Sequence, residues 1–346
     1  MLSVAIFGML LTVQAAAQAH GFTSVSTSAR AMACVEASTG RVLYTKNADE
    51  ALPMASTTKI VTAITVIENV TDLDEIIEVN PKSIGIEGTS IYLQRGEELS
   101  VRELLLGLML RSGNDAATAL ALHVSPTIEG FCAKMKQTSE RAGATNSNYK
   151  NPHGLDEDGH YTTALDLALI SAYAMNNPTF REIVGTKSAK ISGKEYPRVL
   201  HNKNRLLQSL DGCVGVKTGF TKKAGRCYVG AREHDGMTVV CAVLNCGPMF
   251  EDTEAIMKQA ANDYTLTRLL TADEFITPTP ANARHCEEQS DVAIPPQNTP
   301  RGIARTNFFY PLRDDELTDI TIRLDDDNVC IFLRDTLIHC TGYNRI

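Results

Sequence analysis

Strand-forming segments stand at both ends of a long helix-forming stretch in this chain. Residues 31–37 and 41–46 flank a glycine-containing turn, which predicts a β-hairpin. Residues 214–218, 226–232 and 237–245 alternate or run apolar with β-branched side chains, which predicts an antiparallel meander. A sheet must bury at least one face against other elements, and the helices between these segments can cover it. We therefore expect an α+β fold, in which one antiparallel sheet pairs the first and last segments and is flanked by helices.

The helices are predicted from apolar side chains that recur at helical spacing. The clearest one begins at Ser56 and continues to about residue 70, with Ile60, Val61 and Ile64 on one face. Ser56 occupies the N-cap or first-turn position of this helix. Further helices are expected at residues 101–110, 115–123, 164–175 and 252–270, with a break at 111–114.

The sequence changes character from about residue 271. Residues 277–280 read Thr-Pro-Thr-Pro, which indicates a linker, and residues 318–324 and 329–333 alternate as strands do. A small all-β C-terminal domain is therefore expected. Residues 283–307 fit neither domain, and residues 285–291 within them resemble peptides encoded by dispersed bacterial repeat elements, which predicts a disordered insertion. The expected division is 20–270 for the first domain and 271–346 for the linker and the second.

The N-terminus has most features of a secretory signal. Residues 2–13 are apolar, a run too short to span a bilayer, and Ala17-Gln18-Ala19 fits the small-x-small cleavage pattern. No Lys or Arg precedes the apolar run, so a buried N-terminal helix is the alternative. We expect residues 1–19 to be a signal peptide and the protein to be exported to the cell envelope or secreted.

Composition excludes some classes of function. The net charge is −8 and no basic stripe is present, so nucleic-acid binding is not expected. Nine cysteines occur without a C-x-x-C pair, which gives no support to a zinc site. We expect these cysteines to be free, partly buried thiols.

Ser56 and Lys59 form an S-x-x-K sequence at the start of the first predicted helix. Residues three apart share one helix face, so Lys59 can reach the Ser56 hydroxyl, and a helix N-terminus stabilises negative charge there. A serine needs such a neighbouring base to act as a nucleophile. Ser147 and Lys150 match the same pattern, but Ser147 lies in a polar loop with no helix start. We interpret the second match as coincidental.

Two further short motifs follow Ser56 along the chain. Ser112-Gly113-Asn114 lies in the break between two predicted helices, where a capping turn is the simpler interpretation of this motif alone. Lys217-Thr218-Gly219 ends a predicted strand, where a lysine and a hydroxyl can bind a carboxylate and glycine allows close backbone approach. By itself this motif could be an exposed strand end.

Taken in order, the three motifs resemble those of class A β-lactamases and penicillin-binding proteins. The S-G-N form of the middle motif is most similar to that of the low-molecular-weight D-alanyl-D-alanine carboxypeptidases. Residues 151–156, 161–164, 202–207 and 217–221 also resemble that family, and the likeness covers roughly residues 31–270. The resemblance implies a serine carboxypeptidase that removes the terminal D-alanine from peptidoglycan stem peptides ending in D-Ala-D-Ala.

The resemblance also implies a role for each residue of the motifs. Ser56 would form the acyl-enzyme, Lys59 would take its proton, and Ser112 would relay a proton to the leaving amine. Asn114 would hold the substrate amide and Lys59. Lys217 and Thr218, with Gly219 beside them, would bind the terminal carboxylate. The N–H groups of Ser56 and Phe220 would form the oxyanion hole. β-Lactams would be covalent inhibitors, and no metal or organic cofactor would be needed.

Other interpretations remain open. A class A β-lactamase adds a loop glutamate, for which Glu157 and Glu182 are candidates only by location. A transpeptidase would use an amine acceptor, and a catalytically idle wall-binding or interaction protein would keep only the fold. His153, His160 and His201 are interpreted as structural. The C-terminal sequence gives no support to membrane attachment through an amphipathic helix.

Overall fold

The computed structural model describes residues 25–270, 302–304, 308–325, 328–334 and 336–345. Its centre is a five-stranded antiparallel sheet with the strand order β2-β1-β9-β8-β7. The strands are β1 (Ala31–Glu36), β2 (Val42–Lys46), β7 (Cys213–Thr221), β8 (Gly225–His234) and β9 (Met237–Leu244). Because β1 pairs with β9, the predicted joining of the first and last segments is confirmed.

The remaining elements of the first part of the chain lie between β2 and β7 or directly follow β9. The helices are η1 (Ala55–Thr58), α1 (Lys59–Asn69), η2 (Pro81–Ser83), α2 (Val101–Leu110), α3 (Asn114–Val124), α4 (Ile128–Arg141), α5 (Ala164–Met175), α6 (Pro178–Gly185), α7 (Leu206–Ser209) and α8 (Met249–Asp263). Two small hairpins pair β3 (Ile76–Glu78) with β4 (Glu98–Ser100) and β5 (Ser188–Ile191) with β6 (Arg198–His201).

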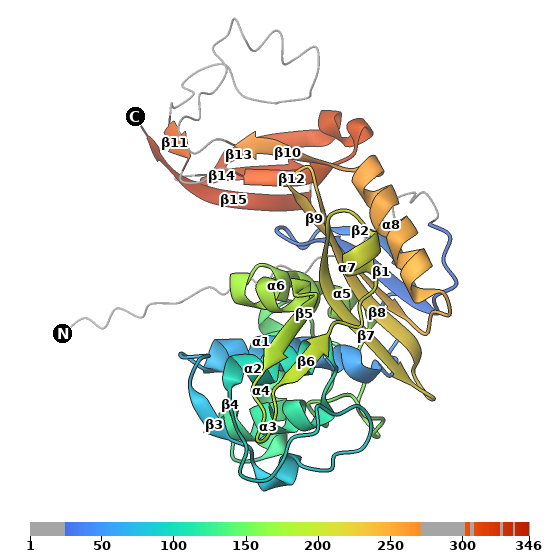
Figure 1. The fold of residues 1–346 in the computed structure, drawn as a ribbon. Helices are drawn as coiled ribbons and strands as arrows, with labels where there is room; N and C mark the ends of the chain where they lie inside the picture. Colours follow the sequence, from blue (N-terminus) through green and yellow to red (C-terminus); the bar gives the residue numbers. More distant parts are fainter. Residues whose placement is uncertain (1–24, 271–301, 305–307, 326–327, 335, 346) are drawn as a thin grey trace, which may run out of the picture.

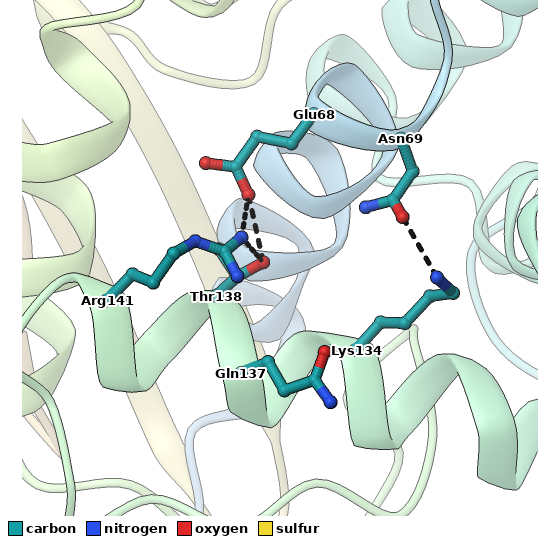
Figure 2. A pocket seen from close by; sticks show the side chains of 6 residues that line it. All are labelled: Glu68, Asn69, Lys134, Gln137, Thr138 and Arg141. Carbon is teal, nitrogen blue, oxygen red and sulfur yellow. Dashed lines mark hydrogen bonds and ion pairs between the residues drawn. The ribbon is translucent and has the colours of Figure 1, made fainter. Parts of the chain in front are cut away.

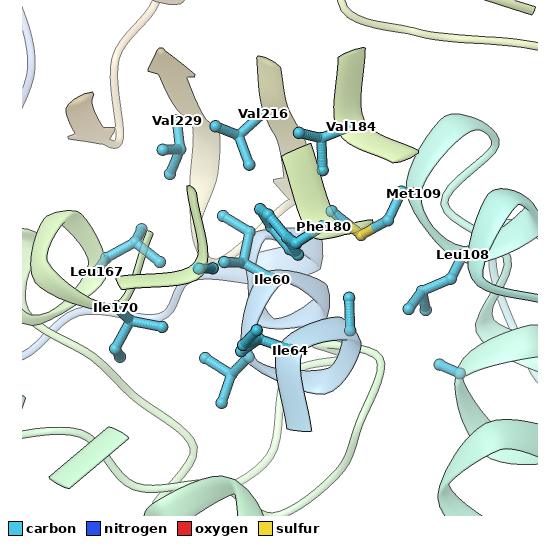
Figure 3. Packing of buried hydrophobic residues seen from close by; sticks show 14 of the residues in the cluster. Ile60, Ile64, Leu108, Met109, Leu167, Ile170, Phe180, Val184, Val216 and Val229 are labelled. Atoms are coloured by element: carbon cyan, nitrogen blue, oxygen red, sulfur yellow. The ribbon is translucent and has the colours of Figure 1, made fainter. Parts of the chain in front are cut away.

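Helices cover both faces of the central sheet (Figure 1). Helix α8 packs on β8 and β9, whereas α5 packs on β1 and β9 from the other side. Helix α1 lies inside the larger core, where Ile60 and Ile64 pack among Phe180, Val216 and other apolar side chains (Figure 3). A helix surrounded by apolar neighbours keeps little freedom of movement, so α1 is a rigid support for the Ser56 turn before it.

The C-terminal part is all-β, as expected. It contains a two-stranded sheet of β10 (Thr265–Leu270) and β12 (Phe308–Leu312), and a four-stranded sheet in the order β11-β15-β14-β13. The latter strands are β11 (Gly302–Ala304), β13 (Ile320–Asp325), β14 (Asn328–Leu333) and β15 (Thr336–Arg345), and η3 (Asp314–Asp319) precedes β13.

Arg41, beside β2, connects the two parts of the chain. Its guanidinium donates to the Pro311 carbonyl and the Glu316 carboxylate, and it lies over the rings of Tyr264 and Tyr310 at 5.3 and 5.0 Å. The side chains of Arg41 and Glu316 are 11% and 10% exposed, so the ion pair is largely buried.

Three expectations need correction. The helix predicted at 252–270 ends at Asp263, because residues 265–270 pair with β12, a partner that local sequence does not reveal. Residues 302–304 form β11 although they were assigned to a disordered insertion, and pairing with β15 orders them. Cys330 is disulfide-bonded, contrary to the expectation of free thiols, whereas Cys34, Cys132, Cys213, Cys227, Cys241 and Cys246 are free. Residues 1–19 and 283–301 lie outside the described residues.

Candidate active site

Ser56 lies in the short 3-10 turn η1, directly before α1. The predicted helix start at this position is confirmed, although the first turn is a 3-10 helix rather than an α-helix. Ala55 has φ of 49°, a left-handed conformation that is uncommon for a residue with a Cβ. Thr57 Oγ1 donates to the Met54 carbonyl at 2.6 Å and Thr58 Oγ1 donates to the Ala55 carbonyl at 2.8 Å. Side-chain hydroxyls therefore hold the backbone on which Ser56 is presented.

Lys59 is fully buried and reaches the Ser56 hydroxyl. Its Nζ lies 3.1 Å from Ser56 Oγ, 2.7 Å from Asn114 Oδ1 and 2.6 Å from the His153 carbonyl oxygen. Burial and the nearby positive charges of Lys217 and Lys203 hold the Lys59 pKa well below its ordinary value. The neutral amine, which can accept a proton from the serine, is thereby favoured.

The break between α2 and α3 carries Ser112 and Asn114. Both are 4% exposed, and Ser112 has φ of 65°. Asn114 accepts from Lys59 and donates through Nδ2 to the Glu87 carbonyl at 2.6 Å, so its amide orientation is fixed. Within the described ranges, no hydrogen bond joins the Ser112 hydroxyl to Lys59 or Lys217.

Strand β7 brings the third motif beside the Ser56 turn. A Cβ built on Gly219 would lie 3.0 Å from the Ser56 backbone nitrogen, so only glycine fits there without displacement. Lys217 is 2% exposed, and burial followed by the charge of Lys203 lowers its pKa to about 7. Its Nζ donates to the Thr218 carbonyl at 3.0 Å. Phe220, which follows Gly219 in β7, is 65% exposed.

Five of the predicted site residues thus meet closely: Ser56, Lys59 and Asn114 through hydrogen bonds, and Gly219 and Lys217 through packing and charge. The arrangement contains a hydroxyl, an adjacent amine with a lowered pKa, and a glycine strand edge at the serine nitrogen. These are the parts that acyl transfer by a serine nucleophile requires. Within the described residues, no group of three or more His, Cys, Asp or Glu side chains is placed to hold a metal ion.

The alternative motif at Ser147 has a different environment. Ser147 Oγ is 2.7 Å from both Asp166 Oδ2 and Thr162 Oγ1, and the exposed Lys150 makes no hydrogen bond to it among the described residues. Ser147 is therefore held by Asp166 and Thr162 and is not hydrogen-bonded to the lysine of its motif.

The loop at residues 151–160 contributes more than the sequence motifs indicate. The carbonyl of His153 accepts from Lys59, and a side chain at Gly154 would overlap the Ala55 carbonyl. Asp156 Oδ1 accepts from Thr221 Oγ1 at 3.0 Å, which ties the loop to β7. Burial, followed by the charge of Lys59, lowers the pKa of His153 to about 3, so its ring is neutral at neutral pH. The resemblance of residues 151–156 to a known family was the only signal for this loop in the sequence.

A separate hollow lies at the other end of α1 (Figure 2). Polar side chains of α1 and α4 line it, and they satisfy one another: Glu68 pairs with Arg141 and Thr138, and Lys134 donates to Asn69 at 3.0 Å. Because these side chains already satisfy one another and lie at the opposite end of α1 from Ser56, we do not assign this hollow as the active site.

Comparisons with known proteins identify the family of this chain. The family model described as D-alanyl-D-alanine carboxypeptidase matches residues 13–247. The D-alanyl-D-alanine carboxypeptidase DacF of Bacillus subtilis is 32% identical over 66% of this chain, which spans 60% of the length of that protein.

Two solved structures extend the comparison. The Streptomyces K15 DD-transpeptidase is 33% identical with a TM-score of 0.63, covering 67% of this chain and 97% of its own. The D-alanyl-D-alanine carboxypeptidase DacD of Francisella tularensis has a TM-score of 0.71 over 95% of this chain and 97% of its own. At 22% identity the latter supports the fold alone, including the C-terminal β part. From the family model and the curated relative together, this chain belongs to the D-alanyl-D-alanine carboxypeptidase family of serine peptidases.

Proposed function

We propose that this protein is a serine-type D-Ala-D-Ala carboxypeptidase that removes the terminal D-alanine from peptidoglycan stem pentapeptides through an acyl-enzyme at Ser56. The single observation that carries this proposal is the buried Lys59, whose Nζ lies 3.1 Å from Ser56 Oγ and whose pKa is lowered by burial. A lysine with a lowered pKa, in contact with a helix-start serine, is suited to general-base activation.

The proposed reaction begins when Ser56 Oγ attacks the carbonyl between the two D-alanines while its proton passes to Lys59 Nζ. The N–H groups of Ser56 and Phe220 stabilise the oxyanion, since β7 lies against the serine turn at Gly219. Ser112 gives its hydroxyl proton to the leaving amine and regains one from Lys59, so that free D-alanine departs. Water then cleaves the acyl ester and restores the Ser56 hydroxyl.

Lys217 and Thr218 hold the terminal carboxylate in this proposal. A buried lysine with a pKa of about 7 gains its proton when an anion binds next to it, because the carboxylate charge favours the ammonium form. Asn114 positions both Lys59 and the substrate amide. β-Lactams would acylate Ser56 in the same way.

A class A-like β-lactamase is the second candidate activity, and it needs a carboxylate to activate water. Glu157 and Glu182 are both exposed. Glu157 accepts from Asn151 at 3.1 Å, and neither carboxylate hydrogen-bonds to Ser56, Lys59 or Asn114 within the described residues. This supports slow deacylation of penicillin and thus the carboxypeptidase over the β-lactamase. The catalytically idle alternative is disfavoured by the contact between Lys59 and Ser56.

We also propose that the protein is exported and acts in the cell envelope, because its proposed substrate is outside the cytoplasm. This rests on the signal-like residues 1–19 and on the activities that the names of its relatives state. Among the described residues, no helix has the length and apolar character that crossing a bilayer requires.

The test is a peptide that ends in D-Ala-D-Ala, incubated with the protein with and without an amine acceptor. Release of free D-alanine without a cross-linked product supports a carboxypeptidase, whereas a cross-linked product indicates a transpeptidase. A Ser56→Ala variant should release none. Rapid hydrolysis of penicillin with no D-alanine release would instead favour the β-lactamase.

A further inference from the structure

His160 is buried behind the serine turn, outside the three motifs. It is 6% exposed, and its ring packs edge-on to Tyr149 with centroids 6.3 Å apart. Both ring nitrogens have partners: the Lys150 backbone N–H donates to Nδ1 at 3.0 Å, and Nε2 is 3.0 Å from Thr58 Oγ1.

These contacts determine the direction of the hydrogen bonds. Because Nδ1 accepts from a backbone N–H, a neutral ring must carry its proton on Nε2. Nε2–H therefore donates to Thr58 Oγ1, and the single Thr58 proton is left for the Ala55 carbonyl at 2.8 Å. The result is a directed chain from His160 through Thr58 to the carbonyl of the residue before Ser56.

The carbonyl at the end of this chain belongs to a strained residue. Ala55 has φ of 49° and immediately precedes the proposed nucleophile. Such conformations persist only where surrounding contacts hold them. Gly154, at φ of 89°, lies so close to the same carbonyl that an added Cβ would overlap it. The loop at residues 151–160 therefore supports the turn at two positions, Gly154 and His160.

We propose that His160 is a positioning residue that orients the Thr58 hydroxyl, and through it the Ala55 carbonyl, so that the Ser56 hydroxyl and N–H are aimed at the substrate. This inference rests on the proposed acylation of Ser56. It assigns His160 no contact with the substrate and no proton transfer in the reaction.

The ring must be neutral for Nδ1 to accept from the Lys150 N–H, and its surroundings keep it so. Burial lowers the pKa of His160 to about 4; Asp156 opposes the shift, whereas the charge of Lys59 adds to it. Protonation would turn Nδ1 into a donor facing the Lys150 N–H, which would break that hydrogen bond and push the ring away from the position in which it donates to Thr58.

The experiment measures the second-order rate of acylation by a fluorescent penicillin, with melting followed by circular dichroism. His160→Leu and Thr58→Val should each lower the rate by about 10- to 100-fold, because small misplacements of reacting groups have effects of that size. The double variant should acylate no more slowly than the slower of the two single variants, because both substitutions interrupt the same series of hydrogen bonds. His160→Gln can both accept and donate, so it should keep most of the wild-type rate. His201→Leu, a change at an exposed histidine of β6, is the matched control and should leave the rate unchanged.

Three results would overturn the positioning role. These are a folded His160→Leu that acylates at the wild-type rate, a His160→Gln that falls as far as His160→Leu, or additive losses in the double variant. Independently of activity, long-range ¹H–¹⁵N spectra at pH 7 should show the Nε2–H tautomer for the signal lost in His160→Gln; an Nδ1–H tautomer would contradict the chain. A wild-type protein that does not react with penicillin at all would instead refute the proposed function.

Discussion

Replacing Gly219 with alanine tests whether β7 and the Ser56 turn act as one recognition unit. The added Cβ would lie 3.0 Å from the Ser56 nitrogen, 3.1 Å from the Thr57 nitrogen and 3.2 Å from the Met54 carbonyl oxygen. All three are backbone atoms, which cannot rotate away as the end of a side chain can. Ordinary van der Waals contact begins at 3.4 Å, so β7 and the turn must separate by a few tenths of an ångström.

This separation acts on the two N–H groups proposed to bind the oxyanion, those of Ser56 and Phe220. Complete loss of one such donor costs about 2.7–4 kcal/mol, or roughly 100- to 1,000-fold in rate. Since the shift lengthens the hydrogen bonds without removing them, we expect Gly219→Ala to lower the acylation rate by about 10- to 100-fold.

The assay is acylation by a fluorescent penicillin, with thermal melting as the test of folding. Gly247→Ala is the matched control, because no atom lies within 4 Å of its added Cβ and its φ is not left-handed. The control should acylate at the wild-type rate. If Gly219→Ala were folded and equally reactive, the close approach of β7 to Ser56 would have no role in catalysis.

Three further changes have distinct expected outcomes. Ser147→Ala removes a hydrogen bond to the buried Asp166 and should cost about 1.5–3 kcal/mol of unfolding free energy while penicillin acylation persists; lost acylation in a folded variant would mean that the wrong serine was chosen. Lys217→Met should abolish D-alanine release yet raise the melting temperature at pH 6. The lowered pKa of Lys217 means that the unfolded wild-type protein binds more protons than the folded one between pH 7 and 10.5, so wild-type stability rises with pH in this range. The increase in melting temperature of Lys217→Met over wild type should therefore be smaller at pH 9 than at pH 6, and an equal increase at both would contradict this. Arg41→Ala leaves the Glu316 carboxylate unpaired and should cost about 3–5 kcal/mol, seen as faster proteolysis of the C-terminal strands with acylation retained; unchanged proteolysis would show that Arg41 does not hold the two parts together.

Local sequence predicted the parts of the site that depend on short-range geometry. The helix start at Ser56 and the three-residue spacing to Lys59 follow from helical periodicity, and the break at Ser112 follows from its position between two apolar segments. The order of the motifs added the family resemblance. Residues 101–110 and 164–175 were predicted with the bounds that α2 and α5 have, because their apolar patterns are local.

Features that depend on distant partners could not be predicted. Lys59 is held by the carbonyl of His153, and no side-chain pattern identifies a backbone acceptor that is distant in sequence. Ala55 has a left-handed conformation for which alanine has no preference, and Gly154 of the distant loop at residues 151–160 packs against its carbonyl. Residues 265–270 became a strand because β12 was available for pairing, which overrode the helical pattern before them.

We propose Ser56 as the nucleophile of an acylating serine enzyme. Incubation with a labelled penicillin, followed by digestion and mass mapping, tests it directly. We expect one covalent adduct on Ser56 that persists long enough to be mapped, and no adduct in Ser56→Ala. An adduct on Ser147 or on any other residue, or labelling that survives in Ser56→Ala, would contradict it.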